Sequence, residues 1–453
     1  MNSMFARLLR LLAGVLTILC CAAAGVKSAP TPYFPLQAMP GHFLVDGHGL
    51  VASKIDHIVW IMQENRSFDD LFQGFPGADT KASGKDSHGN TIPLSPISLA
   101  AGYDIDHSSV AFFAACNGRA SIPGTHCRMN GFNNEFVGCS GNCPPNPQYG
   151  YVPHAESRLY FEMAHQYVLA DRMFTSHLDL SYVSHQYMIA GQAARAVDFP
   201  AGAWGCTGPS NVIATLTDQR TYGPNIPVCQ NYETLGDELD AAGRTWRLYS
   251  ATKQSQWVAY RSIHHIRYGP DWKRNVVGSS AQVILDVASG QLADVTWVTP
   301  SCKNSDHGAC GSRTGPEWVA DVVNAIGQSR FWNSTAIFLM WDEWGGWYDH
   351  VKPPYLDFDG LGFRVPLVVI SPYAKQGYVS HVQYEHGSIL RFIEDRFGLM
   401  RLAASDTRAN SPLEDCFNLN QPARAFHPFG RPLRLQDALR MQREETAQEP
   451  DAE

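Results

Sequence analysis

A short apolar stretch that ends abruptly on polar side chains stands out in residues 55–69. Bulky and β-branched residues make up most of 55–62, and Glu64 and Asn65 follow them closely. Such a short and nearly continuous apolar stretch predicts a strand buried on both faces of a parallel sheet. Open α/β sheets bind ligands at the carboxyl ends of their strands, so Glu64 and Asn65 are predicted to bind a cation or a phosphoryl group. In the alternative, Asn65 and Asp69 only cap the helix expected to follow.

Alternating strand and helix patterns follow this stretch along the chain. The alternation predicts an α/β fold whose mostly parallel sheet carries helices on both faces. Two segments rich in Gly, Asn and Cys, 108–151 and 204–230, are predicted as loop-rich insertions. The predicted strands are 245–250, 294–299, 335–341 and 365–370, and the predicted helices are 156–169, 234–242, 317–327 and 384–397.

The length and charge of the chain bound the class of protein. Its 453 residues suffice for one large α/β domain with insertions, or for two domains. The formal net charge is −8, and the sequence contains no long basic run. Because binding to a nucleic-acid backbone requires clustered Lys and Arg, we do not expect nucleic acid as a main partner.

The two ends of the chain are predicted to lie outside the folded domain. Residues 1–29 have the features of a secretory signal peptide, with Arg7 and Arg10 before an apolar core. The alternatives are a membrane anchor, for which the apolar stretch is short, and a lipoprotein site at Cys20 or Cys21. We therefore expect a secreted or periplasmic protein. Residues 30–53 are predicted as an irregular lead-in, 54–438 as a single domain with insertions, and 439–453 as a charged, disordered tail.

Cysteine usage agrees with export. Of the 11 cysteines, Cys20 and Cys21 fall in the predicted signal peptide, and the others include four pairs of near neighbours. Spacing alone does not determine connectivity, and a zinc cluster is the alternative, but an exported chain favours disulfides. Cys416 is left over. The expected disulfides are Cys116–Cys127, Cys139–Cys143, Cys206–Cys229 and Cys302–Cys310.

A second buried-strand pattern ends in a pair of carboxylates. The apolar stretch at 335–341 is followed directly by Asp342 and Glu343. Adjacent carboxylates repel each other, so a bound cation would explain why both stay ionised. Ion pairs with Arg or Lys are the alternative. Gly345 and Gly346 come next and would let the backbone turn sharply or approach a ligand closely.

Both motifs resemble those of one known family. Glu64-Asn-Arg-Ser-Phe-Asp69 is similar to the signature of the bacterial phosphoesterase family, which holds secreted phospholipases C and related acid phosphatases. Trp341 to His350 also matches, and the resemblance extends over residues 54–402. It implies an alkaline-phosphatase-like three-layer α/β/α sandwich with a mostly parallel central sheet and disulfide-bearing insertions. Residues 54–438 would form a single phosphoesterase catalytic domain.

The resemblance also implies which residues carry the chemistry. Ser181 matches the nucleophile of the family, with Ser184 and Thr175 as fallback candidates. His185 would face the same cleft, and His386 would either serve there or cap a helix. Histidine suits proton donation to a leaving alkoxide or to phosphoryl oxygens. The histidines implied in this role are His107, His307 and His350.

The implied cofactor is a divalent metal ion bound mainly by oxygen atoms. An oxygen-rich ligand set favours calcium, magnesium or manganese over zinc. Some members of the family carry Asp at the position of Glu343, and the extra carbon could alter coordination or metal choice. Members also differ in whether they need a metal at all. The implied ligands are Glu64, Asn65, Ser181, Asp342 and Glu343.

Together these features predict an exported hydrolase of phosphoric esters of the phospholipase C or acid phosphatase type. Ser181 would attack phosphorus, and water would then hydrolyse a phosphoseryl intermediate. The expected partner is a small-molecule phosphate ester or a phospholipid head group, with membrane contact only as a substrate surface. The alternative is a non-catalytic secreted binding protein on the same fold. A sulfate-ester hydrolase is disfavoured because the chain lacks the Cys-x-Pro-x-Arg motif of sulfatases.

Overall fold

The computed structural model describes residues 54–139, 141, 143–208 and 210–445. The predicted signal peptide and lead-in, residues 1–53, lie outside the described residues. Among the described residues, the helices are all too short or too polar to span a bilayer.

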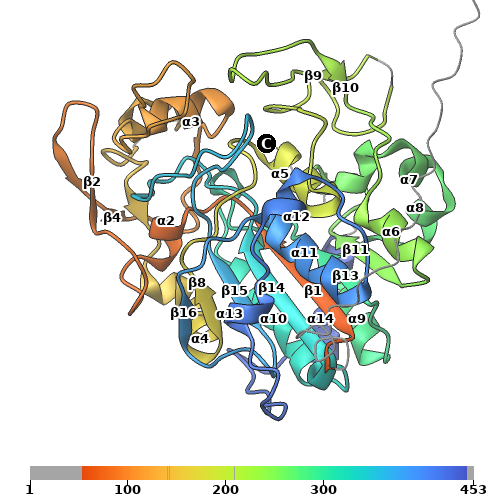
Figure 1. Cartoon of the computed structure of the whole chain (residues 1–453). Helices are drawn as coiled ribbons and strands as arrows, with labels where there is room; N and C mark the ends of the chain where they lie inside the picture. The colour runs from red at the N-terminus through yellow and green to blue at the C-terminus, as the bar shows by residue number, and fades with distance from the viewer. Residues whose placement is uncertain (1–53, 140, 142, 209, 446–453) are drawn as a thin grey trace, which may run out of the picture. The chain divides into compact units, whose positions relative to one another are not determined.

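An eight-stranded sheet forms the centre of the fold (Figure 1). Five of its seven neighbouring strand pairs are parallel, and β15 runs antiparallel to the strand on either side of it. The mostly parallel sheet predicted from the sequence is therefore confirmed. In spatial order the strands are β12 (Val276–Gly278), β11 (Trp246–Ser250), β13 (Val295–Val298), β1 (His57–Gln63), β14 (Thr335–Trp341), β15 (Leu367–Ile370), β8 (Val168–Ala170) and β16 (Tyr378–Ser380).

Strand β1 lies inside this sheet, between β13 and β14. Ile58 pairs with Val295 on one side and with Ala336 on the other, and both pairings are parallel. Six of the seven β1 residues are buried. The apolar stretch therefore forms the doubly covered strand that its composition predicts.

Alternate side chains of β14 show that helices cover both faces of the sheet. Trp341 packs against Tyr160 of α4 (His154–Gln166), with ring centroids 4.8 Å apart. Phe338 packs against Phe392 of α11 (His386–Phe397), at 5.0 Å. Positions 338 and 341 differ in parity along the strand, so their side chains point to opposite faces. The three-layer α/β/α arrangement is confirmed.

The other helices extend these two layers. Helices α9 (Gln282–Ala288), α10 (Gly315–Gly327) and α14 (Leu435–Glu445) pack in one layer with α4. Helices α5 (Ser181–Ala190), α6 (Leu235–Ala241) and α12 (Ala404–Arg408) pack in the other layer with α11. The remaining α-helices of the described residues are α2 (Phe68–Phe72), α3 (Ser109–Cys116), α7 (His264–Tyr268), α8 (Pro270–Arg274) and α13 (Leu413–Cys416).

Loop-rich segments around the sheet carry the remaining short strands and the disulfides. All four expected disulfides are present, namely Cys116–Cys127, Cys139–Cys143, Cys206–Cys229 and Cys302–Cys310. Cys416 is free and buried. The short strands are β2 (Ser83–Lys85), β3 (Thr91–Pro93), β4 (Ser95–Pro96), β5 (Asp104–Ile105), β6 (Val137–Gly138), β7 (Gly150–Tyr151), β9 (Val212–Ile213) and β10 (Ile226–Pro227).

Two segments differ from the sequence prediction. The helix predicted at 156–169 ends at Gln166, and the next residues form β8, because they pair with β15 and β16. The disordered tail predicted from residue 439 is wrong for 439–445, which belong to α14. Glu445 anchors this helix through its buried carboxylate, which accepts hydrogen bonds from Ser279 and from the backbone N–H of Ala281.

We expect Glu445→Ala to destabilise the fold, because it leaves these donors at the start of α9 without their acceptor. The expected loss is about 1–3 kcal/mol in the free energy of unfolding. Urea denaturation followed by circular dichroism measures it. The control is Glu444→Ala, which removes only exposed ion pairs with Lys303 and Arg440 and should cost less than about 1 kcal/mol. Equal losses in the two variants would contradict a packed α14.

Candidate active site

Three segments distant in the sequence meet at the carboxyl edge of the sheet. Glu64 and Asn65 follow β1, Asp342 and Glu343 follow β14, and Ser181 is the first residue of α5. The Ser181 Oγ lies 3.3 Å from Oε2 of Glu64 and 3.5 Å from Oδ1 of Asn65. All five residues are buried. The structure therefore brings together the residues that the sequence predicted as nucleophile and metal ligands.

A hydrogen bond from a backbone N–H to a side-chain carboxylate connects the ends of the two strands. The Asn65 N–H donates to Oδ1 of Asp342 over 2.9 Å. Asn65 has φ of 56°, a left-handed conformation that Asn tolerates better than most residues. A Cβ added to Gly345 would lie 2.4 Å from the Asn65 carbonyl oxygen, so this position needs glycine. The close approach predicted for Gly345 is therefore an approach to Asn65. Ser67, and not Asn65 or Asp69, caps α2.

His107 contacts this cluster from the loop after β5. Its Nδ1–H donates to the carbonyl oxygen of Ile105 over 2.6 Å, so Nε2 is the acceptor in the neutral ring. The Asn65 amide donates to this Nε2 over 3.1 Å, and Oε1 of Glu343 lies 3.6 Å from it. His107 can therefore exchange a proton on the side that faces Asn65 and Glu343.

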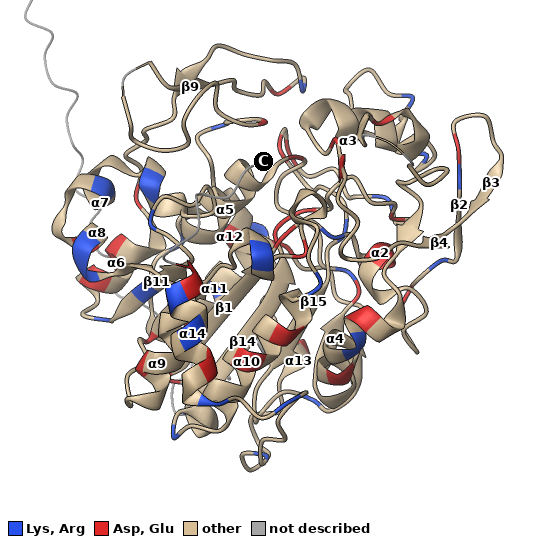
Figure 2. Ribbon diagram, turned by 180° about the vertical axis from the view of Figure 1, so that it is seen from behind, with Lys and Arg blue, Asp and Glu red and all other residues tan. Residues whose placement is uncertain are grey.

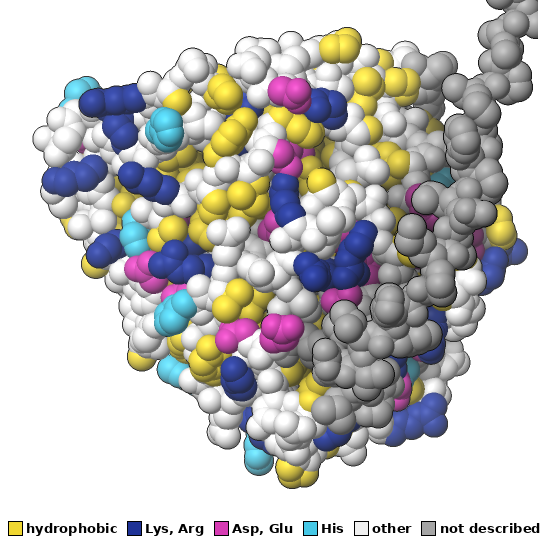
Figure 3. Space-filling model, viewed as in Figure 1, with side chains coloured by type: hydrophobic (Ala, Val, Ile, Leu, Met, Phe, Trp, Pro, Cys, Tyr) yellow, Lys and Arg dark blue, Asp and Glu magenta, His cyan; other side chains and the backbone are white. Residues whose placement is uncertain are grey.

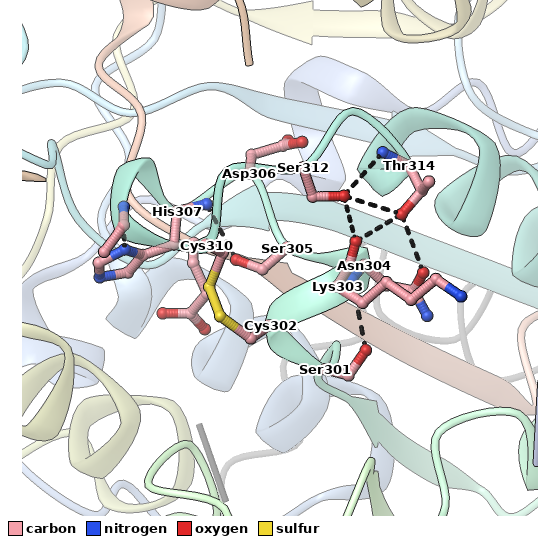
Figure 4. The surroundings of a disulfide bond; sticks show 12 residues. Ser301, Cys302, Lys303, Asn304, Ser305, Asp306, His307, Cys310, Ser312 and Thr314 are labelled. Carbon is pink, nitrogen blue, oxygen red and sulfur yellow. Dashed lines mark hydrogen bonds between the residues drawn. A yellow bond between two sulfur atoms is a disulfide. The ribbon is translucent and has the colours of Figure 1, made fainter. Parts of the chain in front are cut away.

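His307 lies in the loop closed by the disulfide Cys302–Cys310 (Figure 4). Its Nδ1 accepts the backbone N–H of Ala309 over 3.1 Å, so the neutral ring carries its proton on Nε2. This Nε2 is buried and has no hydrogen-bond partner among the described residues. Burial lowers the pKa of His307 to about 4, although the negative charge of Asp104 opposes the shift. At neutral pH the ring is an uncharged donor, 5.9 Å from the His107 ring.

His185 lies one turn along α5 from Ser181. Its Nε2 is 2.9 Å from Oε1 of Glu64 and 4.0 Å from Oδ2 of Asp342. Burial lowers the pKa of His185 to about 4, so the ring is neutral near pH 7. In that form an Nε2–H donates to Glu64 and orients the carboxylate.

Glu64, His185 and Asp342 also form a group that could hold a cation. One ligand atom from each lies within 4.8 Å of the others. Oδ2 of Asp342 is buried and has no hydrogen-bond partner among the described residues, which is the environment that a cation would satisfy. The residues present therefore fit a divalent metal ion, with His185 either as a nitrogen ligand or as the group that orients Glu64.

Two further histidines stack beside the cluster. The rings of His177 and His386 lie 5.5 Å apart and nearly parallel. His386 accepts the Ser176 N–H on Nδ1, and burial lowers its pKa to about 3. Glu385, and not His386, is the N-cap of α11, so the capping role considered for His386 is wrong. Sequence reasoning did not single out His177, whose spacing from Ser181 carries no signal of contact.

The structure does not bring His350 into this cluster. Its Nδ1 lies 2.6 Å from Oδ2 of Asp69, and its Nε2 lies 3.1 Å from Oδ1 of Asp79. Asp69, Asp349 and His350 form a second group that could hold a cation. However, the buried guanidinium of Arg364 already contacts Asp349 through two hydrogen bonds, at 2.9 and 3.0 Å. These contacts support a structural role for His350.

Comparison with protein-family models identifies the family of this chain. The model of the Phosphoesterase family matches residues 55–400. Non-hemolytic phospholipase C of Pseudomonas aeruginosa is 26% identical over 88% of this chain, and the match spans 62% of that protein. Phospholipase C B of Mycobacterium tuberculosis is 27% identical over 80% of this chain and 75% of that protein. A solved alkaline phosphatase superfamily protein from Vibrio parahaemolyticus aligns over 79% of this chain and 71% of its own, with 8% identity and a TM-score of 0.38.

We expect His350→Gln to lower stability more at pH 6 than at pH 9. Burial alone would lower the pKa of His350, but its hydrogen bond and charge interaction with Asp69 raise it overall. A raised folded-state pKa stabilises the protein below the unfolded pKa of about 6.5, and that stability is lost as pH rises through the folded value. The expected loss at pH 6 is about 1–3 kcal/mol, measured by urea denaturation at both pH values.

The matched control for this experiment is His88→Gln, since the His88 side chain is 77% exposed and should contribute little at either pH. A loss for His350→Gln that grows toward pH 9 would contradict the proposed ion pair.

Proposed function

Because the chain belongs to the phosphoesterase family, we propose that it is an exported hydrolase of phosphoric esters that uses Ser181 as its nucleophile. The observation that carries this proposal is the position of the Ser181 hydroxyl. It lies at the N-terminus of α5 and within 3.5 Å of Glu64 and Asn65. The N-terminus of a helix attracts anions, so a phosphoryl group there would face both the hydroxyl and the backbone N–H groups of α5.

The proposed reaction begins with attack of the Ser181 oxygen on phosphorus, in line with the leaving oxygen. The hydroxyl proton passes to a carboxylate, and Glu64 offers one at 3.3 Å. The Nε2–H of His307 and the N–H groups of α5 donate to the phosphoryl oxygens as negative charge builds up on them. The leaving alkoxide takes a proton from Nε2 of His107 in its imidazolium form, which leaves a neutral ring with its remaining proton on Nδ1. Water then attacks the phosphoseryl intermediate and gives a proton to Nε2 of His107. Ser181 leaves and takes back the proton held by Glu64.

A divalent cation fits this scheme as a bound cofactor. When bound, it would lower the pKa of the serine hydroxyl and offset charge on the phosphoryl group. The residues that would hold it are Glu64, Asn65, Ser181 and Asp342, with Glu343 or His185 completing the set. The oxygen-rich set supports calcium, magnesium or manganese, and a His185 nitrogen ligand would favour manganese or zinc.

The names of the relatives suggest the substrate class. Both bacterial relatives are named phospholipases C, which supports a phospholipid head group or a small phosphate diester as the substrate. Export follows from the predicted signal peptide. The alternative of a non-catalytic binding protein is not favoured, because the structure assembles Ser181, Glu64 and Asp342 around one point.

We expect Ser181→Ala to reduce turnover by at least roughly 10³-fold, because it removes the hydroxyl that lies within 3.5 Å of Glu64 and Asn65. The measurement compares p-nitrophenyl phosphate with p-nitrophenyl phosphorylcholine, and a preference for the diester is expected. The control is Thr175→Ser, which keeps a hydroxyl at a fallback position and should keep most of the activity. Normal turnover by Ser181→Ala would show that the nucleophile lies elsewhere.

We expect a chelator to lower turnover at least about tenfold, and an added divalent cation to restore it. Glu64→Gln should weaken cation binding, because it replaces a charged ligand by a neutral amide. Isothermal titration of the chelated protein with Ca²⁺, Mg²⁺, Mn²⁺ and Zn²⁺ measures this binding independently of activity. Full activity in a chain shown to be metal-free would refute the metal requirement and leave the Ser181 assignment intact.

A further inference from the structure

Four exposed apolar side chains lie on the loop-rich insertions near the candidate active site. They come from α3, from the loop before β6, and from the two ends of the segment around β9. Apolar side chains exposed to this degree are unusual when they cluster, and clusters mark contact sites for proteins or membranes. The four residues, which we call the apolar rim, are Val110 (55% exposed), Phe136 (72%), Phe199 (58%) and Tyr222 (55%).

Hydrogen bonds hold the parts of the apolar rim next to one another. The N–H of Ser109 donates to Oδ1 of Asp198 over 2.8 Å, which places Val110 beside Phe199. The Tyr222 hydroxyl donates to Oδ2 of the same Asp198 over 2.6 Å. The backbone of Asp106 likewise donates to the carbonyl oxygen of Phe136 over 2.8 Å. These contacts bring the chain segments that carry the four residues to one region of the fold, and each of the four side chains is exposed.

A pocket leads inward from this region. It has a volume of about 190 Å³, and Phe199 and Asp106 help to form its wall. His107 and Leu180, the residue before Ser181, also form part of it. The apolar rim is thus continuous with the candidate active site. Figure 3 shows hydrophobic side chains scattered over one face, several of them in its upper part, where Figure 1 has α3, α5 and β9.

The charges near the apolar rim indicate which kind of lipid surface it could contact. Figure 2 shows where acidic and basic residues lie on the fold. Asp106 and Asp198 are half-buried directly beside rim residues, and Asp104 joins them in the pocket wall. The whole chain has a formal net charge of −8. Carboxylates at such a rim attract the ammonium groups of zwitterionic head groups and repel an anionic lipid surface.

We propose that the apolar rim docks the protein onto the surface of a zwitterionic lipid aggregate, with the pocket opening toward the head groups. The inference rests on the proposed phosphoric-ester hydrolysis and names the surface from which that substrate is taken. Phe and Tyr side chains are suited to the boundary between head groups and acyl chains. Docking holds the candidate active site against the lipid surface, so phosphoester head groups reach Ser181 without leaving the aggregate.

Sedimentation with vesicles tests the proposal without requiring turnover. The native chain should bind phosphatidylcholine vesicles more tightly than phosphatidylglycerol vesicles. Val110→Ser combined with Phe136→Ser should weaken binding to phosphatidylcholine at least tenfold and leave turnover of soluble p-nitrophenyl phosphorylcholine unchanged. The control combines Met400→Ser with Leu435→Ser, two exposed apolar residues outside the rim, and should change binding less than twofold.

Three results would overturn the proposal. The first is that the native chain does not bind phosphatidylcholine vesicles. The second is that the rim variant binds these vesicles as tightly as the native chain. The third is that the native chain binds phosphatidylglycerol vesicles more tightly than phosphatidylcholine vesicles. A concentration-dependent dimer that dissociates in the rim variant, seen by sedimentation velocity, would assign the rim to a second copy of this chain instead. Vesicle binding with no ester hydrolysis would support the docking surface and refute the proposed function. Hydrolysis of the soluble ester without vesicle binding would support the proposed function and refute the docking surface.

Discussion

The parallel pairing of β1 with β14 is the constraint on which the candidate active site depends. Parallel neighbours end at the same edge of a sheet, so Glu64 and Asn65 emerge beside Asp342 and Glu343. The hydrogen bond from the Asn65 N–H to Asp342 keeps the two strand ends in register. The close contact at Gly345 prevents any larger side chain there. Helix α5 then needs only to bring Ser181 to this edge to complete the cluster.

The two buried acidic clusters, around Asp349 and around Asp342, differ in how their negative charge is balanced. Around Asp349 the guanidinium of Arg364 supplies the opposite charge inside the protein. Among the described residues, the ion-pair contact of Asp342 is with His185, and burial lowers the pKa of that histidine. The charge of the cluster around Asp349 is therefore balanced within the protein. The cluster around Asp342 is instead suited to a cation or to a phosphoryl group that binds from solution. This contrast separates a structural site from a site for chemistry.

The main parts of the fold could be predicted from local pattern. Strands β1, β11, β13, β14 and β15 are short and apolar, and α6, α10 and α11 have clear helical spacing, so local composition was sufficient for each. Local pattern did not predict the secondary structure of segments that depend on tertiary contacts. Residues 168–170 are too few to signal a strand until β15 and β16 pair with them. The charged segment after residue 438 looks disordered until Ser279 and Ala281 bind Glu445.

By itself the sequence determined the α/β class, the family and the residue types at the ends of β1 and β14, because these are encoded within short segments. Only the tertiary structure decided which histidines join them. His107 and His307 reach the cluster because a loop and a disulfide-closed turn return to the same edge. His350 was predicted alongside them, but Asp69 and Asp79 hold it elsewhere. The physical reason is that a side chain's partners depend on the folding of distant segments, which spacing along one segment does not encode.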